Sequence, residues 1–273
     1  MISEFTKIIR LVLAAIIVLA GCRQEYKEGV DVLACGPDFE VMPVPADYAS
    51  SSIVAAGGLQ EWARERKLEL DGVVALPQGD GSVYLTEWRC DIYPWSNSIR
   101  ISSFEPQGEF VCELSNGGFR VLTGTQVIEG LASQIGVRDL ADAILAVTTA
   151  SVRFLDTSSQ FTRASEPVRV QGLWYYPIER TYVGQQTPSG GKVRETGQPG
   201  PYWSQVVFYQ NRDNWLVDII RFADVDEQKF FSVRGYDYAR VRKKGILVPA
   251  KIEIFRSDAR RGLLRRVAQV SFQ

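Results

Sequence analysis

Histidine is absent from this sequence of 273 residues. Serine and cysteine hydrolases usually use an imidazole as their base, and most catalytic transition-metal sites include an imidazole ligand. The absence therefore argues against several reaction classes at once, while chemistry based on carboxylates or lysines stays open. We expect a binding or structural role, with no catalytic residue, no metal site and no cofactor.

Cysteine is scarce, and its spacing argues against another group of sites. The four cysteines are Cys22, Cys35, Cys90 and Cys112, and no two of them are separated by two residues. That separation is typical of zinc sites and redox-active dithiols, so neither is expected. Beyond Cys22 the number is odd, and at most one disulfide can form among the remaining three.

Long apolar runs are lacking as well. A short basic opening leads into the uncharged run Leu11 to Ala20, about half of the roughly 20 residues needed to cross a bilayer. The run ends in the motif Leu19-Ala20-Gly21-Cys22, which resembles a bacterial lipobox. The resemblance implies a signal peptide over residues 1–21 and lipidation of the Cys22 sulfur. An ordinary signal peptide followed by an incidental cysteine is the alternative.

Residues 22–45 are polar and rich in glycine and proline, without periodicity, and we interpret them as an acylated tether. A flexible stretch of this length has an r.m.s. reach of about 25–30 Å, enough to hold a domain clear of lipid head groups. We therefore expect a cell-envelope protein facing the periplasm. Arg23 follows Cys22 where the proteobacterial signal for inner-membrane retention has Asp, which favours the outer membrane.

The overall charge gives no reason to expect a nucleic-acid partner, because 31 Lys and Arg nearly balance 32 Asp and Glu. The stretch beyond Arg240 is locally basic, and it is either a surface for anionic lipids or a set of solubilising turns. Asp224, Asp226 and Glu227 lie within four residues. A solvated turn explains these carboxylates better than a calcium site, because no glycine-containing ligand loop surrounds them.

The chain from Ala46 onward predicts one domain, 46–273, that begins with helix. An Ala- and Ser-rich helix is expected up to Ala56, a break at Gly57-Gly58 and a further helical turn from Leu59. Period-two alternation of apolar residues then predicts a series of strands. The predicted strands are Leu68 to Leu76, Val83 to Tyr93, Ile99 to Phe104, Glu109 to Leu114, Phe119 to Leu122, Val170 to Ile178, Tyr202 to Gln210, Trp215 to Phe222, Phe230 to Val241, Ile246 to Phe255 and Leu263 to Phe272.

Between Gln126 and Asp156 the apolar period becomes helical, which predicts a pair of helices in the middle of a β-rich chain. The fold class that follows is α+β: a strongly curved antiparallel sheet, an incomplete β-barrel, with helices in or across its hollow. Sequential pairing would place Cys90 and Cys112 two strands apart, too far for a disulfide, so both are expected as buried thiols.

This order of elements resembles the LolA/LolB-like lipoprotein-carrier superfamily, and the motifs that carry the resemblance are Gly57-Gly58-Leu59-Gln60-Glu61-Trp62 in the first helices and Trp215-Leu216-Val217 and Ile246 to Ile252 in the second meander. The resemblance covers roughly Ala46 to Gln273. In that superfamily an incomplete barrel, lidded by helices, holds acyl chains. The chain resembles LolB in being a lipoprotein itself, and it departs from the pattern in its tether and in the long loop Thr181 to Pro201.

The resemblance implies that apolar residues of the helices and the sheet line a cavity; a closed core is the alternative that periodicity cannot separate from it. The expected ligand-binding residues are Trp88, Phe110, Leu131, Ile135, Leu140, Ile144 and Trp215. Leu131→Ala or Ile144→Ala at a cavity wall should weaken fatty-acid binding and destabilise the protein by less than the roughly 2–5 kcal/mol of a core residue.

The function expected from these features is non-catalytic binding of a lipid or acyl chain, for example the acyl chain of a lipoprotein, in an apolar cavity, with the membrane reached through lipidated Cys22. Two alternatives stay open. The chain could be an accessory lipoprotein that docks another envelope protein through its sheet surface, or an enzyme that depends on carboxylates.

Overall fold

The computed structural model describes part of the unit Asp31–Gln273. The residues it describes are 41–43, 46–106, 108–115, 118–131, 135–182, 203, 205–224, 228–241, 245–258 and 263–273. Cys22, Cys35, the expected signal peptide and most of the tether lie outside these residues, as do Asp226, Glu227 and most of the loop Thr181 to Pro201.

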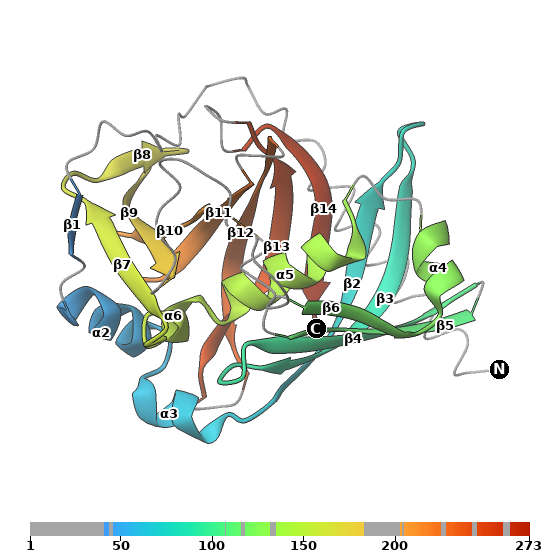
Figure 1. Ribbon diagram of the computed structural model, residues 1–273, viewed down its shortest axis with the longest axis horizontal. Coiled ribbons are helices and arrows are strands. Elements are labelled where there is room, and N and C mark those ends of the chain that lie inside the picture. Colours follow the sequence, from blue (N-terminus) through green and yellow to red (C-terminus); the bar gives the residue numbers. More distant parts are fainter. Residues whose placement is uncertain are drawn as a thin grey trace, which may run out of the picture. The chain divides into compact units, whose positions relative to one another are not determined.

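The described strands form one antiparallel sheet (Figure 1). They are β1 (Val41–Pro43), β2 (Leu68–Pro77), β3 (Val83–Tyr93), β4 (Ser98–Glu105), β5 (Gly108–Ser115), β6 (Gly118–Thr123), β7 (Ser159–Ala164), β8 (Val168–Val170), β9 (Leu173–Tyr182), β10 (Gln205–Asn211), β11 (Val217–Asp224), β12 (Lys229–Arg240), β13 (Leu247–Arg256) and β14 (Arg265–Phe272). Their order is β1-β7-β9-β10-β11-β12-β13-β14-β2-β3-β4-β5-β6, and β8 pairs with β9. Strand β14 therefore joins the late meander to the early one.

The sheet is open and bent. Its outermost strands, β1 and β6, do not pair with each other in the described part of the chain. Register shifts interrupt the pairing at Val111/Cys112, Tyr209/Gln210 and Ile254/Phe255. Such bulges increase the local bend and twist of a strand. The expected fold class, a curved antiparallel sheet forming an incomplete barrel, is confirmed.

Helix α5 (Val137–Thr148) fills the hollow of the sheet. It contacts β11, β12 and β13 and also β4 and β5, strands that lie far apart in the sheet order, and Figure 1 shows it in front of β12 and β13. A Cβ at Gly235 on β12 would lie 2.9 Å from Cγ2 of Val147, so the glycine allows the helix to approach the sheet closely. The other helices are α2 (Ala46–Ala55), α3 (Leu59–Arg64), α4 (Thr125–Gly130) and α6 (Ala150–Arg153).

The predicted break between the first two helices is present. Gly57 and Gly58 both have positive φ, 114° and 90°, which favours glycine. A Cβ at Gly57 would also lie 2.9 Å from the Cα of Ile246, and the backbone N–H of Leu247 donates to the carbonyl of Ala56 at 2.9 Å. The break thus seats the end of α2 against β13.

Several segments differ from the predicted strands. The segment predicted as one strand from Val170 to Ile178 turns at Gln171 and Gly172, both with positive φ, and so separates β8 from β9. Strand β7 was not predicted, because Ser159–Ala164 is mostly polar. Residues Val41–Pro43, placed in the tether by composition, pair with β7 as strand β1.

Cys90 and Cys112 are buried free thiols in the structure. Ile101 of β4 is the register partner of both, so one strand lies between them. Strands are spaced about 4.7–4.9 Å apart, which puts the two cysteines beyond disulfide distance. Burial raises the pKa of the Cys112 thiol to about 12, and it raises the pKa of Cys90 further.

Candidate functional site

The inner face of β3, β4 and β5 is the apolar wall that the sequence predicted. Trp88 on β3 is opposite Ser103 on β4, which is in turn opposite Phe110 on β5. The rings of Trp88 and Phe110 meet edge to face with centroids 5.7 Å apart, and both side chains are buried. Side chains alternate between the two faces of a strand, so Trp88 and Phe110 lie on the inner face while their sequence neighbours on each strand face outward.

Two helices cover this wall, and they do so to different degrees. On α5, Leu140 and Ile144 are both 0% exposed, and Ile135 just before the helix is 7% exposed. On α4, by contrast, no residue is fully buried. Its apolar residues Val127 and Ile128, with Leu131 at its C-terminal cap, are partly buried and pack against the same core.

The structure therefore brings together six of the seven expected ligand-binding residues: Trp88, Phe110, Leu131, Ile135, Leu140 and Ile144 belong to, or pack against, one core. Leu140 and Ile144 of α5 have no exposed surface, so side chains fill the space around this helix, and the least buried of the six is Leu131 at the C-terminal cap of α4. Whether these residues bind a ligand stays a prediction.

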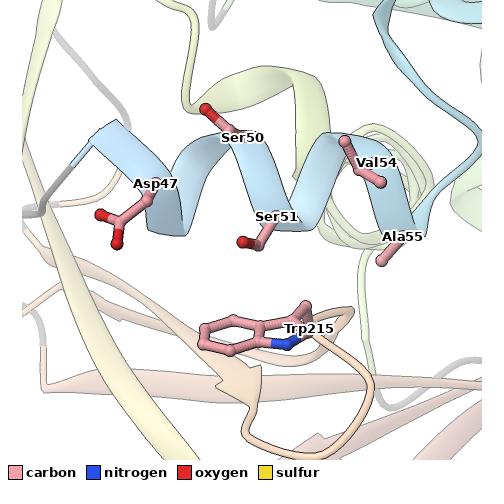
Figure 2. A pocket seen from close by; sticks show the side chains of 6 residues that line it. All are labelled: Asp47, Ser50, Ser51, Val54, Ala55 and Trp215. Atoms are coloured by element: carbon pink, nitrogen blue, oxygen red, sulfur yellow. The ribbon is translucent and has the colours of Figure 1, made fainter.

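Trp215, the seventh residue, lies elsewhere. It precedes β11 with φ 65°, so it is part of the turn and not of the strand in which alternation placed it. Its indole forms one side of a groove of about 560 Å³ whose other side is α2. Figure 2 shows Ser51 and Ala55 pointing from α2 toward the indole.

Aromatic rings hold Trp215 in place. Its ring stacks on Tyr176 at 6.3 Å and meets Tyr48 edge to face at 5.4 Å. The guanidinium of Arg163 lies 4.5 Å from the centroid of Tyr48, a cation–π distance. These contacts attach α2 to β7, to β9 and to the turn that precedes β11. The groove is thus separate from the apolar wall at Trp88 and Phe110.

A polar cluster on the inner face was missed by the sequence reasoning. Glu105, 7% exposed, accepts hydrogen bonds from the hydroxyls of Tyr84, Thr86 and Ser103, the last at 2.6 Å. Burial, reinforced by Glu105, raises the pKa of Tyr84 to about 12, so its hydroxyl keeps its proton at neutral pH. The signal was present in the alternation: Thr86 and Ser103 have the inward parity of Trp88 and Ile101.

A second buried polar group lies on α5. Asp139 pairs with Lys229 of β12 at 2.7 Å, and Asp142 accepts a hydrogen bond from Nε1 of Trp203. Burial, with a smaller contribution from Asp139, raises the pKa of Asp142 to about 6, although the hydrogen bond from Trp203 opposes the shift. Among the described residues, these two carboxylates come closest to supporting the alternative of a carboxylate-dependent enzyme, but each of them is paired or hydrogen-bonded with a neighbouring side chain.

Asp142→Asn is expected to raise the free energy of unfolding at pH 7.5 by about 1–3 kcal/mol, because a shift of one pKa unit corresponds to about 1.4 kcal/mol. The folded-state pKa of about 6 lies above the usual 3.8. The protonated group therefore favours folding below about pH 4, and this contribution is lost as the pH rises through 6. Urea unfolding between pH 5 and 7.5 would measure it, with the exposed Asp213→Asn as control. A loss of stability in Asp142→Asn at pH 7.5 would contradict the assignment.

The remaining candidates from the sequence are metal ligands, the basic C-terminal stretch and a membrane span. No group of three or more His, Cys, Asp or Glu that could hold a metal occurs among the described residues. Several basic residues of the C-terminal stretch pair with acidic neighbours on the sheet surface: Lys251 with Asp237 at 2.7 Å, and Arg266 with Glu253 at 2.6 Å. No helix in the described ranges has both the length and the apolar character needed to span a membrane.

Comparisons with known proteins place the fold. No protein-family model and no curated protein matches the chain. A LolA superfamily protein from Nitrosomonas europaea matches in structure with a TM-score of 0.52 and 12% identity, over 84% of this chain and 92% of that one. A domain named for outer membrane lipoprotein sorting from Vibrio parahaemolyticus gives 0.43 at 8% identity, over 82% and 91%. A DUF1329 family protein from Desulfovibrio piger gives 0.42 at 11% identity, over 83% and 90%. The chain has a LolA-like fold.

Proposed function

We propose that the protein binds the acyl chain of a lipid or of a lipidated protein, without catalysis, on the inner face of the sheet beneath α4. The observation that carries the proposal is the shallow packing of α4 on this face, whose wall residues Trp88 and Phe110 are themselves 2% and 0% exposed. Helix α4 places its apolar residues on the core, yet none of its residues is fully buried. The wall below it contains Trp88 and Phe110.

The energetics favour α4 as the element that moves. It has six residues, too few to be stable as an isolated helix, so it is held by its contacts with the sheet. Those contacts involve partly buried side chains and are correspondingly weak. An acyl chain contributes about 0.8 kcal/mol for each buried methylene, so burial of a few methylenes can offset the contact energy that α4 loses when it moves away from the sheet.

The proposed binding residues follow from this geometry. Leu131 and the residues of α4 would contact the chain first, Trp88 and Phe110 would form the wall, and Ile135, Leu140 and Ile144 would form the floor. Trp215 is left out because it lies in the separate groove against α2. The LolA-like fold agrees with the proposal, because the resemblance of the sequence to that superfamily implies an incomplete barrel that holds acyl chains.

The proposal extends to the location of the protein. We propose that Cys22 is acylated, that the domain faces the periplasm and that the outer membrane is the more suitable anchor. The support is the lipobox-like motif Leu19-Ala20-Gly21-Cys22, followed by Arg23 in place of the retention signal. The docking alternative has less support, because the exposed large apolar side chains of the described residues are distributed over several elements, among them Phe104 of β4 and Trp174 of β9.

Binding of a fluorescent fatty acid tests the function. The wild-type protein should bind the probe, and Leu131→Asp should weaken binding at least tenfold, because a carboxylate would have to be desolvated in the apolar site. Leu122→Asp is the matched control: Leu122 is an exposed leucine on β6, 43% accessible, and its substitution should leave the dissociation constant unchanged. Absence of binding by the wild-type protein of both this probe and its methyl ester, which has no charged head, would sink the proposal.

A further inference from the structure

The inner face of the sheet becomes polar at the end of β3 and β4 that lies next to α4. Trp88 is opposite Ser103, and the alternation then brings Thr86 and Glu105 to the same face. Glu105 is the register partner of Gly108, and Cγ2 of Val127 in α4 lies 3.8 Å from the position of a Cβ at Gly108. The polar cluster thus adjoins the helix beneath which the acyl chain is proposed to enter.

The charge of Glu105 is not balanced within the described residues. Its carboxylate accepts from three hydroxyls, of Tyr84, Thr86 and Ser103, and no described Lys or Arg forms an ion pair with it. Its exposed fraction is 7%. Hydroxyl donors offset part of the desolvation of a carboxylate, but a buried charge is best compensated by an opposite charge.

A second buried polar atom lies beside this cluster. Nε1 of Trp88 has no hydrogen-bond partner in the described part of the chain, although the side chain is only 2% exposed. Buried indole N–H groups usually find an acceptor. Trp88 lies on the same face as Thr86, two residues away, and opposite Ser103, and both of these residues donate to Glu105. Among the described residues, therefore, the unpartnered indole N–H of Trp88 is next to the carboxylate of Glu105, which has no cationic partner.

We propose that this end of the site receives the polar head of the amphiphile: a primary ammonium that pairs with Glu105, joined to the acyl chain through a carbonyl that accepts from Nε1 of Trp88. The inference rests on the proposed acyl binding and adds the chemical class of the ligand, an acyl amide or ester with an amino group. The ammonium supplies the missing positive charge, and the carbonyl supplies the missing acceptor. The apolar residues beneath α4 hold the chain.

Three probes with the same chain and the same amide test the head-group preference in the purified full-length protein: N-dodecanoyl ethylenediamine, N-dodecanoyl ethanolamine and N-dodecanoyl glycine. They differ only in ending with an ammonium, a hydroxyl or a carboxylate. The ammonium probe should bind at least tenfold more tightly than the hydroxyl probe, and the carboxylate probe should bind most weakly. This order of affinities can be measured with the wild-type protein alone.

Two variants then separate the contacts. Glu105→Gln should bring the ammonium and hydroxyl probes within threefold of each other, whereas Glu87→Gln, an exposed glutamate on the outward face of the same strand β3 as Trp88, should keep the preference. Trp88→Phe should weaken all three probes by a similar factor and leave their order unchanged. Equal binding of the three probes by the wild-type protein would overturn the inference while leaving acyl binding intact. Failure to bind these probes and the fluorescent fatty acid alike would remove the proposed function together with it.

Discussion

Gly124→Ala should lower the free energy of unfolding by about 2–4 kcal/mol, because two effects add at this position. Gly124 caps α4 with φ 75°, a left-handed conformation that costs an L-residue about 1–2 kcal/mol. A Cβ there would also overlap the carbonyl oxygen of Glu109 and lie 2.7 Å from the Cα of Phe110. Both are backbone atoms of β5, and a paired strand cannot yield as a flexible side chain can.

Gly130 provides the matched control for this result. It is the last residue of the same helix, and an added Cβ would meet nothing within 4 Å. Gly130→Ala should therefore leave stability unchanged or raise it by up to about 1 kcal/mol, as expected from helix propensity. Urea unfolding of both variants measures the difference. Equal stability of Gly124→Ala and Gly130→Ala would show that α4 does not depend on its close approach to β5.

Ile144→Ala should cost about 2–5 kcal/mol of stability, and Leu131→Ala clearly less, on the order of 1 kcal/mol. Ile144 is 0% exposed on α5 and lies in the filled core, whereas Leu131 is only partly buried at the end of α4. The loss on truncation depends on how many contacts a side chain has and on the void that is left. Binding of the fatty acid should nevertheless respond to Leu131→Ala, since Leu131 lies where the chain is proposed to enter.

The same two variants distinguish a permanent cavity from a site that opens. A permanent cavity around α5 would make both substitutions mild, which is what the sequence led us to expect. Core-sized destabilisation by Ile144→Ala together with mild destabilisation by Leu131→Ala supports opening beneath α4. Core-sized loss at both positions, without any fatty-acid binding, would make this part of the molecule a closed core.

Local patterns predicted most of the elements because alternation and helical spacing report directly on burial. Strand β3 begins and ends where alternation placed it, at Val83 and Tyr93. Where the backbone turns within an apolar stretch, alternation fails: Gln171 and Trp215 both have positive φ, and neither residue type signals this. Polar composition likewise concealed β7, whose pairing with β9 comes from tertiary context.

The candidate site was predictable in part. The inward positions of Trp88 and Phe110 follow from their strands, and Leu140 and Ile144 follow from the helical period. The sequence could not show that α5 fills the hollow, because a core and a cavity wall have the same apolar periodicity. Nor did it single out Glu105, whose burial depends on two hydroxyls of the neighbouring strand β3 and one of its own strand β4.

The position of β14 between β13 and β2 has a consequence for how the chain folds. The residues that pair across this junction, such as Val74 and Val270, are separated by almost the whole domain. A chain made from its N-terminus can assemble the hairpins β2 to β6 early, but the edge of β2 stays without its neighbour until β14 has been made. Closing so long a loop is slow and adds to the kinetic barrier. During that interval β2 presents an unpaired edge to other chains, so the newly made protein is most prone to aggregation before its last described strand arrives.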